Sequence, residues 1–337
     1  MKTILITGGA GFIGSNFIPY FIEKYPEYRI INLDKLTYAG DLDNLKEVET
    51  HPRYKFIKGD ICDNQLVEKI FKDLDIHGVI HFAAESHVDN SIKGPEIFID
   101  TNIKGTFILI NNARNHWMEK PFVYKKGYQG CRFHHISTDE VYGTLGDTGS
   151  FKETTSYAPN SPYSASKAGS DFIVRSYHYT YGMNTVITNC SNNYGPKQHD
   201  EKLIPTVICS AVNLRPIPVY GKGLNTRDWL HVLDHCKGID AVYHKGKTGE
   251  TYNIGSRNEQ KNIDVVKKIC EILDVKNPRI DGKPYKELIT FVEDRAGHDW
   301  RYAIDSSKIE KEIGWKAERS FVFGLEQTVD FYLSRFL

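Results

Sequence analysis

"TGGAGFIG", from Thr7 to Gly14, is the stretch that decides the fold of this chain. It follows an apolar run from Lys2 to Thr7 and opens a segment whose apolar side chains recur with the period of a helix. Gly8, Gly11 and Gly14 let the turn close and let backbone N–H groups approach a pyrophosphate at the positive end of that helix. A strand, a glycine turn and a helix in this order predict a dinucleotide-binding unit.

Asp34 lies 20 positions beyond Gly14, at the end of the next apolar run. A carboxylate at this place binds the adenosine ribose hydroxyls and would repel a 2′-phosphate, so the sequence favours NAD over NADP. The alternative is a tight structural turn with an incidental Asp34. Asp60, which ends a third run, is placed to meet the adenine, and an ordinary turn acid is an equal interpretation.

Short apolar runs alternate with helix-length segments through the first half of the chain. Such alternation predicts an α/β fold with a doubly wound parallel sheet of the Rossmann type. The predicted strands are residues 2–7, 29–33, 54–59, 78–84, 133–138 and 184–189. After about Cys190 the chain becomes rich in Pro, Gly and Asn, which indicates a second, smaller α/β substrate-binding domain. We expect an NAD-binding domain over 1–190, with a returning segment near 224–245, and the substrate-binding domain mainly over 191–337.

Composition excludes several classes of partner. The 337 residues carry 43 Lys plus Arg and 43 Asp plus Glu, so no net basic charge attracts nucleic acid or an anionic membrane. Six scattered cysteines form no CxxC pair, which fits reduced thiols and predicts neither a disulfide framework nor a metal site. No run of eighteen apolar residues and no signal-peptide core is visible. We expect a cytoplasmic protein that binds a small molecule.

The segment "YSASK" places Tyr163 and Lys167 four residues apart, on one face of a helix that should begin near Ser161 and Pro162. An ammonium beside a phenol favours the phenolate, so we expect Lys167 to lower the pKa of Tyr163 towards neutrality. A phenolate can take a proton from a substrate hydroxyl while the carbon gives a hydride to nicotinamide. A surface tyrosine with a solvated lysine is the alternative.

In "HHISTDEVYG", His134 to Gly143, two adjacent carboxylates, Asp139 and Glu140, directly follow a buried strand. Acids at the start of a helix can simply complement its dipole. They can also be an acid and a base for one reaction. The residues alone leave both interpretations open.

Together, "TGGAGFIG", "STDEVYG" and "YSASK" resemble the extended short-chain dehydrogenase/reductase superfamily. Within it, "DKLTYAG", "AAESHVD", "SNNYGP", "EKLIP" and "NTRDWL" are similar to the dTDP-glucose 4,6-dehydratase family. The likeness runs from Thr7 to Asp305, and the Asp-Glu pair before "VYG" is its most specific motif. It implies an NAD-dependent lyase that turns dTDP-glucose into dTDP-4-keto-6-deoxyglucose, a precursor of deoxysugars such as rhamnose.

The resemblance also implies catalytic roles. The residue matching Tyr163 oxidises C4 together with NAD⁺, the one matching Thr138 hydrogen-bonds the C4 oxygen, and Lys167 also contacts the nicotinamide ribose. Glu140 matches the base at C5 and Asp139 the acid that protonates the departing C6 hydroxyl. Asp139 must then be protonated, which a desolvated site beside Glu140 favours by raising one of the two coupled pKa values.

Further residues match binding positions of the family. The implied cofactor contacts are Gly8, Gly11, Phe12, Ile13, Gly14, Asp34, Lys35, Leu36, Thr37, Asp60, Ile61, Ala83, Ala84, Ser86, Thr101, Tyr163, Lys167 and Asn193. The implied substrate contacts are His87, Thr138, Asn192, Lys202, Leu203, Pro218, Tyr220, Arg227, Asn262 and His298. Arg227 suits a diphosphate because a guanidinium binds phosphate oxygens bidentately. Asn262 could instead cap a helix, Pro218 and Tyr220 could pack a loop, and His87 could be an ordinary histidine.

Ala296 and Trp300 depart from the family pattern, which usually reads "RPGHDRRY" where this chain has "RAGHDWRY". Competing functions are a 4-epimerase or decarboxylase of another nucleotide sugar, against which the Asp-Glu pair argues, and a non-catalytic NAD-sensing protein. A sensor would need the glycine turn but not the acid pair. The family is usually a dimer through helices of its sheet domain, so a homodimer is expected.

Overall fold

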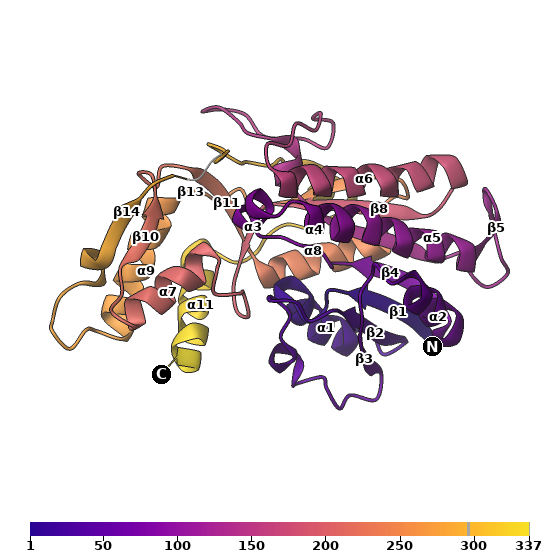
Figure 1. The fold of residues 1–337 in the computed structure, drawn as a ribbon, viewed down its shortest axis with the longest axis horizontal. Coiled ribbons are helices and arrows are strands. Elements are labelled where there is room, and N and C mark those ends of the chain that lie inside the picture. Colours follow the sequence, from indigo (N-terminus) through magenta and orange to yellow (C-terminus); the bar gives the residue numbers. More distant parts are fainter. Residues whose placement is uncertain (295–296, 337) are drawn as a thin grey trace.

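The computed structural model describes residues 1–294 and 297–336, and Ala296 lies outside the described residues. Its centre is a seven-stranded, wholly parallel sheet (Figure 1) with the strand order β12-β8-β7-β4-β1-β2-β3. The strands are β1 (Lys2–Thr7), β2 (Tyr28–Asp34), β3 (Tyr54–Lys58), β4 (Ile76–His81), β7 (Arg132–Thr138), β8 (Thr185–Cys190) and β12 (Thr251–Ile254). The predicted fold class is therefore confirmed.

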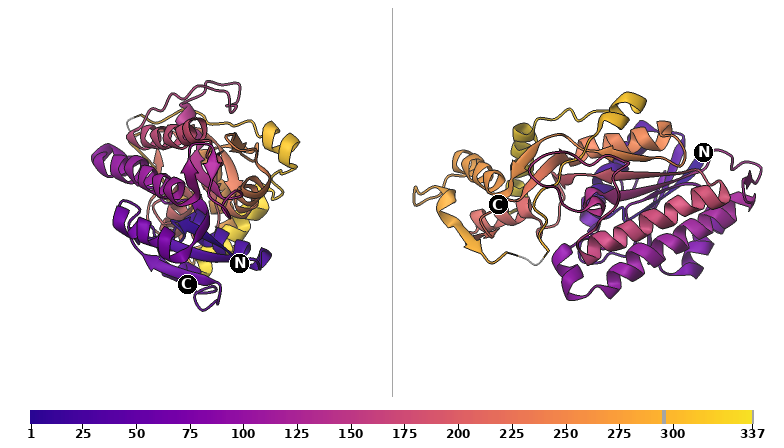
Figure 2. Two further views of the ribbon diagram at one scale, coloured as in Figure 1. Left: turned by 90° about the vertical axis from the view of Figure 1, so that its right-hand side faces the viewer. Right: turned by 90° about the horizontal axis from the view of Figure 1, so that it is seen from above.

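Helices cover both faces of this sheet (Figures 1 and 2), and this is why its inner strands are almost continuously buried. In β1, Ile4 and Ile6 pack towards one face and Leu5 towards the other. The first face carries α1 (Phe12–Lys24) and α8 (Val232–Lys245), and the second carries α2 (Asn64–Leu74), α5 (Thr106–Trp117) and α6 (Pro162–Tyr181). Because all the strands are parallel, the carboxyl ends of β1, β2, β4, β7 and β8 meet at one edge.

Short elements complete this part of the chain. They are the 3₁₀ helices η1 (Leu42–Leu45) and η3 (Asp139–Tyr142), the helices α3 (Val88–Lys93) and α4 (Glu96–Phe98), and the π-helical segment η2 (Ile99–Gly105). Between α5 and β7 the chain forms an antiparallel pair, β5 (Met118–Lys120) with β6 (Val123–Tyr124). The strand expected to reach Ala84 ends at His81, because the following residues leave the sheet to form the edge of the site.

Most of the chain after Cys190 builds the smaller part at the carboxyl edge of the sheet, on the left of Figure 1, whereas α8, β12 and α10 (Ser307–Ile313) pack with the large sheet. A three-stranded sheet has the order β13-β11-β9, and β10 pairs with β14 in parallel. The elements of the smaller part are β9 (Asn192–Tyr194), α7 (Leu203–Val212), β10 (Ile217–Tyr220), β11 (Thr226–His231), β13 (Glu259–Lys261), α9 (Asn262–Lys276), η4 (Tyr285–Leu288), β14 (Ile289–Val292) and α11 (Phe321–Phe336). α7, α9 and α11 share their own apolar core, distinct from the two cores of the large sheet.

All six cysteines are free thiols. Across residues 1–294 and 297–336, no helix is both long enough and apolar enough to cross a membrane. Within the same residues, no cluster of three or more His, Cys, Asp or Glu side chains is arranged to hold a metal ion.

Candidate active site

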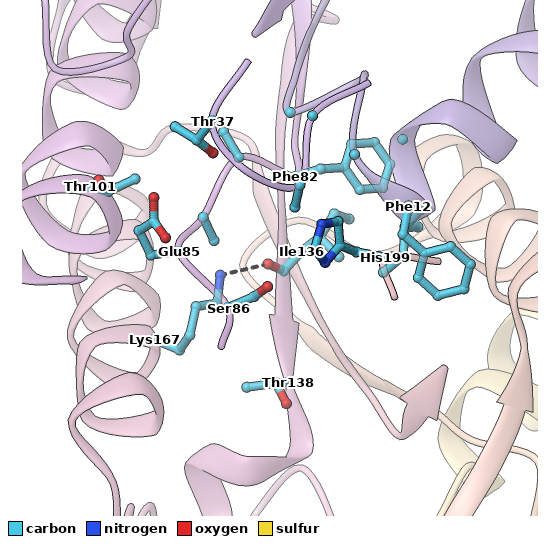
Figure 3. Close-up of a pocket in the computed structure, with 18 of the residues that line it drawn as sticks. Phe12, Thr37, Phe82, Glu85, Ser86, Thr101, Ile136, Thr138, Lys167 and His199 are labelled. Atoms are coloured by element: carbon cyan, nitrogen blue, oxygen red, sulfur yellow. Dashed lines mark hydrogen bonds between the residues drawn. The ribbon is translucent and has the colours of Figure 1, made fainter. Parts of the chain in front are cut away.

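A cavity of about 310 Å³ opens where the carboxyl ends of the parallel strands meet (Figure 3). Its lining runs from the glycine turn, past the ends of β2, β3 and β4, to the ends of β7 and β8 and the start of α6. Open parallel sheets bind ligands in this crevice because helix N-termini and loop residues converge there. The cavity is therefore the candidate active site.

The glycine turn forms one wall of the cavity as a cradle of bare backbone. Gly8 has φ +73°, and a Cβ there would lie 2.5 Å from the Ala83 nitrogen, while a Cβ on Gly14 would lie 2.5 Å from the Gly8 oxygen. A Cβ on Gly11 would lie 3.4 Å from that same oxygen, so its position is roomier. Gly11 precedes α1 and has no side chain to cap its N–H groups. This uncapped helix N-terminus fits a pyrophosphate.

Asp34 ends β2 beside the turn and is nearly buried. Its Oδ2 accepts a hydrogen bond from the Ala10 N–H at 2.9 Å, and its Oδ1 accepts one from the Leu36 N–H at 2.8 Å. Burial raises the pKa of Asp34, and these two donors oppose the rise. Each carboxylate oxygen has a second lone pair, so the group can also accept hydrogen bonds from ribose hydroxyls.

Asp60 ends the third strand run and pairs with Lys35 at 2.8 Å. Burial would raise the pKa of Asp60, but the hydrogen bonds from Lys35 and the Cys62 N–H and the charge of Lys35 together outweigh burial and hold that pKa below its usual value. Asp60 is thus a charged acid in the cavity lining, just after β3. Together with the glycine turn and Asp34, it fits a dinucleotide.

The acid pair lies where β7 passes into η3. Thr138 Oγ1 accepts a hydrogen bond from the Glu140 N–H at 3.3 Å and lies 3.5 Å from Asp139 Oδ1. Asp139 is 1% exposed and Glu140 is half-buried. Burial, and next the negative charge of Glu140, raise the pKa of Asp139 well above its usual value. The expected rise of one pKa in this pair is confirmed in direction.

Helix α6 begins as expected, with Pro162 as its first residue and Ser161 as its N-cap in a capping box with Ser164. The cap sets the register that turns Tyr163 and Lys167 into the cavity. Lys167 Nζ donates to the Ile136 carbonyl at 2.8 Å (Figure 3), and burial lowers the pKa of Lys167 to about 8.

The expected pKa of Tyr163 was wrong in direction. Burial raises the pKa of Tyr163 well above its usual value, and the negative charge of Glu140 adds to the rise. A hydrogen bond with Thr138 lowers it by less. The Lys167 ammonium is directed to the Ile136 carbonyl, and its charge does not offset the loss of water around the phenol.

The cavity brings the predicted cofactor residues together. Those that line it are Gly8, Gly11, Phe12, Ile13, Gly14, Asp34, Lys35, Thr37, Asp60, Ile61, Ala83, Ala84, Ser86, Thr101, Tyr163, Lys167 and Asn193. Leu36 is outside the lining, and its N–H holds Asp34 instead.

Of the predicted substrate residues, Thr138, Asn192 and Lys202 line the cavity. The other seven lie outside its lining: His87, Leu203, Pro218, Tyr220, Arg227, Asn262 and His298. His87 caps α3. The remaining six are in the smaller part of the chain, on α7, α9, β10, β11 and the segment before Asp299. Buried Oδ1 atoms of Asn192 and Asn262 have no hydrogen-bond partner among the described residues, as a site awaiting polar ligand groups would show.

Arg227 is 4% exposed on β11, and its guanidinium donates to the carbonyls of Asp299 and Trp300 at 2.8 and 3.3 Å. The same guanidinium lies over the ring of Tyr302. Trp300, which departs from the family pattern, is 46% exposed and joins this loop to the segment after η3 by donating its backbone N–H to Thr144 Oγ1. The loop near Trp300 is therefore tied to the acid-pair segment.

Thirteen residues that line the cavity were not predicted from the sequence: Leu33, Ala39, Gly40, Gly59, Phe82, Glu85, Ile136, Ser137, Cys190, Ser191, Gln198, His199 and Glu201. Most are direct neighbours of predicted residues along the chain, and adjacency at a strand end was the signal that could have found them. Asp171, four residues after Lys167, is buried beside the site and was also missed.

The chain has extensive similarity to known proteins. Residues 5–328 match the family model described as GDP-mannose 4,6 dehydratase. The chain is 52% identical over 334 residues to a dTDP-glucose 4,6-dehydratase of Xanthomonas campestris, covering 99% of this chain and 94% of that protein.

Two solved structures have the same fold. The dTDP-glucose 4,6-dehydratase of Bacillus anthracis in complex with NAD is 45% identical with a TM-score of 0.86, covering 99% of this chain and 97% of that one. DesIV, the dTDP-glucose 4,6-dehydratase of Streptomyces venezuelae with NAD and dTDP bound, is 42% identical with a TM-score of 0.89 and the same coverage.

Proposed function

We infer, from the premise that this chain belongs to the dTDP-glucose 4,6-dehydratases of the NAD-dependent epimerase/dehydratase family, that it removes water from dTDP-glucose. The product is dTDP-4-keto-6-deoxyglucose, a precursor for deoxysugars. The observation that carries the assignment is the acid pair Asp139 and Glu140 beside Tyr163 and Lys167, on one wall of a dinucleotide cavity.

NAD supplies hydride chemistry when it is bound, taking a hydride from C4 of the sugar and giving it back at C6. The residues proposed to hold it are the glycine turn with the α1 N-terminus for the pyrophosphate, Asp34 for the ribose and Asp60 for the adenine. Lys167 would also hold the nicotinamide ribose. The other predicted cofactor residues in the lining support this pose.

We assign proton removal from the C4 hydroxyl to the Tyr163 phenol oxygen. Because burial holds the phenol protonated, the phenolate has to form within the loaded site, next to the positive charge of Lys167. Thr138, hydrogen-bonded to Tyr163, is placed to hold the C4 oxygen while it becomes a carbonyl.

The C4 ketone acidifies the hydrogen on C5, and Glu140 takes that proton. The C5–H electron pair forms the C5–C6 double bond as the C6–O bond breaks, and Asp139 gives its proton to the departing hydroxyl, which leaves as water. The raised pKa of Asp139 keeps that proton available at neutral pH. Glu140 then returns its proton to C5 when the hydride reaches C6, so the reaction has no net redox change.

Substrate binding is assigned to both parts of the chain. Thr138, Asn192 and Lys202 line the cavity itself. We propose that Arg227 and the other predicted substrate residues of the smaller part bind the nucleotide and its diphosphate. Arg227 contacts the loop of Trp300, and this loop is hydrogen-bonded to the segment after η3. The proposed division is an NAD-binding domain over 1–190, with a returning segment near 224–245 that contains α8, and a nucleotide-sugar domain mainly over 191–337. The strand β12 also joins the large sheet.

A homodimer in the cytoplasm is our further proposal. Helices α5 and α6 lie side by side (Figure 2) and expose Phe107 by 46% and Phe172 by 56%, which a second copy would cover. The six free thiols suit a reducing compartment. Sedimentation of the wild type against Phe107→Glu and Phe172→Glu tests the dimer: wild-type protein that sediments as a monomer would contradict it.

The assay that tests the function presents the purified protein with dTDP-, UDP-, CDP- and GDP-glucose. Loss of water, seen by mass and by absorbance of the 4-keto product in base, is expected with dTDP-glucose. Inversion at C4 without a change of mass would support the 4-epimerase alternative. Binding of NAD without any turnover would support the sensor alternative.

A further inference from the structure

Behind the active site, helix α6 carries a stripe of three ionisable side chains, Tyr163, Lys167 and Asp171, at intervals of four residues. Residues at this spacing lie above one another on one helix face. Tyr163 and Lys167 line the cavity, whereas Asp171 lies one turn deeper and is only 2% exposed. The proposed reaction does not use this buried carboxylate.

Asp171 is held by groups from two other elements. Its Oδ2 accepts hydrogen bonds from the Ser137 hydroxyl and the Tyr157 phenol, both at 2.9 Å. Its Oδ1 lies 3.2 Å from His135 Nε2. Ser137 and His135 belong to β7, the strand that delivers the acid pair, so Asp171 joins α6 to the catalytic strand end.

Lys167 shares the same surroundings. Its Nζ donates to the Ile136 carbonyl and lies 3.5 Å from His135 Nε2, the same nitrogen that faces Asp171. Lys167 is 4% exposed, so its charge is shielded by very little water. A buried ammonium needs a compensating charge, because desolvation penalises an uncompensated ion heavily.

We propose that Asp171 is a positioning residue, whose carboxylate is the counter-charge that keeps the Lys167 ammonium protonated beneath Tyr163. This role rests on the proposed function, in which Lys167 acts as a cation. It adds to that function the group whose negative charge stabilises the positive charge of Lys167 in a site from which water is excluded.

The other titratable groups packed around Lys167 and Asp171 carry no charge near pH 7, so Asp171 is the anion that faces Lys167 among them. Burial lowers the pKa values of His81 on β4 and His135 on β7, and raises those of Cys190 on β8, Tyr142 on η3, Tyr157 before α6 and Tyr163. All six are therefore neutral near pH 7. Burial raises the pKa of Asp171 to about 6, with the charge of Lys167 opposing, and lowers that of Lys167 to about 8, with the charge of Asp171 opposing. Between these two values both groups are charged.

The test compares kcat for dTDP-glucose across pH in four variants and the wild type. Asp171→Asn should move the alkaline limb of kcat to lower pH by about 1 to 3 units, because Lys167 loses its counter-charge. Asp171→Glu should restore most of the wild-type limb. Tyr157→Phe, which removes one hydrogen bond but keeps the charge, should leave the limb in place.

Asp234→Asn is the matched control, since Asp234 is a buried aspartate, 1% exposed on α8, that pairs with Arg319 away from the site. It should lower Tm without moving the limb. The proposal would be overturned if folded, active Asp171→Asn had the same alkaline limb of kcat as the wild type. It would also be overturned if Tyr157→Phe or Asp234→Asn shifted that limb as far as Asp171→Asn does. A wild type without dehydratase activity would instead refute the proposed function.

A second measurement does not depend on Asp171→Asn folding. The pKa of Asp171 is higher in the folded protein than in the unfolded chain, so Asp171 lowers the stability of the fold as pH rises above the usual pKa of an aspartate. Removing the positive charge of Lys167 raises the folded pKa of Asp171 further. Lys167→Met should therefore lose more Tm between pH 5 and pH 8 than the wild type does. This readout needs no catalysis, and equal losses of Tm would overturn the pairing.

Discussion

Asp139 and Glu140 are adjacent in the chain, but Asp139 is buried with its pKa raised well above the usual value, and Glu140 is half-buried beside it. The negative charge of Glu140 is the second cause of the rise, after burial. Asp139 Oδ2 has no hydrogen-bond partner among the described residues, so its proton is available to a ligand. Two adjacent residues thus provide an acid, Asp139, and a base, Glu140, at neutral pH.

Replacing the acid should separate oxidation from elimination. Asp139→Asn cannot protonate the departing hydroxyl, so we expect NADH to form and C5 hydrogen to exchange with solvent while water loss falls by about 10² to 10⁴-fold. Stopped-flow absorbance of NADH and the mass of the product measure the two steps. Asp147→Asn, an exposed acid of the following loop, is the control and should behave as wild type.

Replacing the base should act one step earlier. Glu140→Gln keeps the shape of the side chain but cannot take the C5 proton, so incorporation of deuterium from D₂O at C5 should fall by about 10² to 10⁴-fold. Mass spectrometry of recovered dTDP-glucose measures it. Exchange at the wild-type rate would show that another group is the base.

The wild-type enzyme should lose activity on the alkaline side. Lys167 has a pKa of about 8, so it is charged below that pH and neutral above it, and kcat should fall as pH rises through about 8. Lys167→Arg keeps its charge throughout this range, because a guanidinium does not deprotonate. Its kcat, although lower, should stay flat from pH 7 to pH 9, and a matching fall in this variant would assign the limb to another group.

Two glycines of the turn should respond differently to alanine. Gly8→Ala forces a Cβ to 2.5 Å from the Ala83 nitrogen at φ +73°, so the fold should lose roughly 1 to 3 kcal/mol or more. Gly11→Ala meets only the Gly8 oxygen at 3.4 Å, so its Tm should stay near wild type. If the pyrophosphate lies against this turn, Gly11→Ala should still weaken NAD binding at least tenfold by calorimetry. Unchanged NAD affinity would place the cofactor elsewhere.

Local sequence patterns predicted the elements that depend on near neighbours. The glycine run, the capping residues of α6 and the spacing of Tyr163 and Lys167 act over a few residues, and the structure has the turn and helix that they predict. The continuous apolar runs predicted six of the seven parallel strands. The seventh, β12, was not predicted, because Thr251–Ile254 is short and pairs with β8, a strand far away in the chain.

The sequence by itself determined the fold class, the dinucleotide turn and which residue types could carry the chemistry, because period and spacing are properties of the chain alone. Only the tertiary structure decided how those groups ionise. The pKa of Tyr163 rises and that of Lys167 falls because distant segments remove water from both. Lys167 and Asp171 both lie near His135 Nε2 only because β7 and α6 pack together, and desolvation depends on everything that surrounds a group in space.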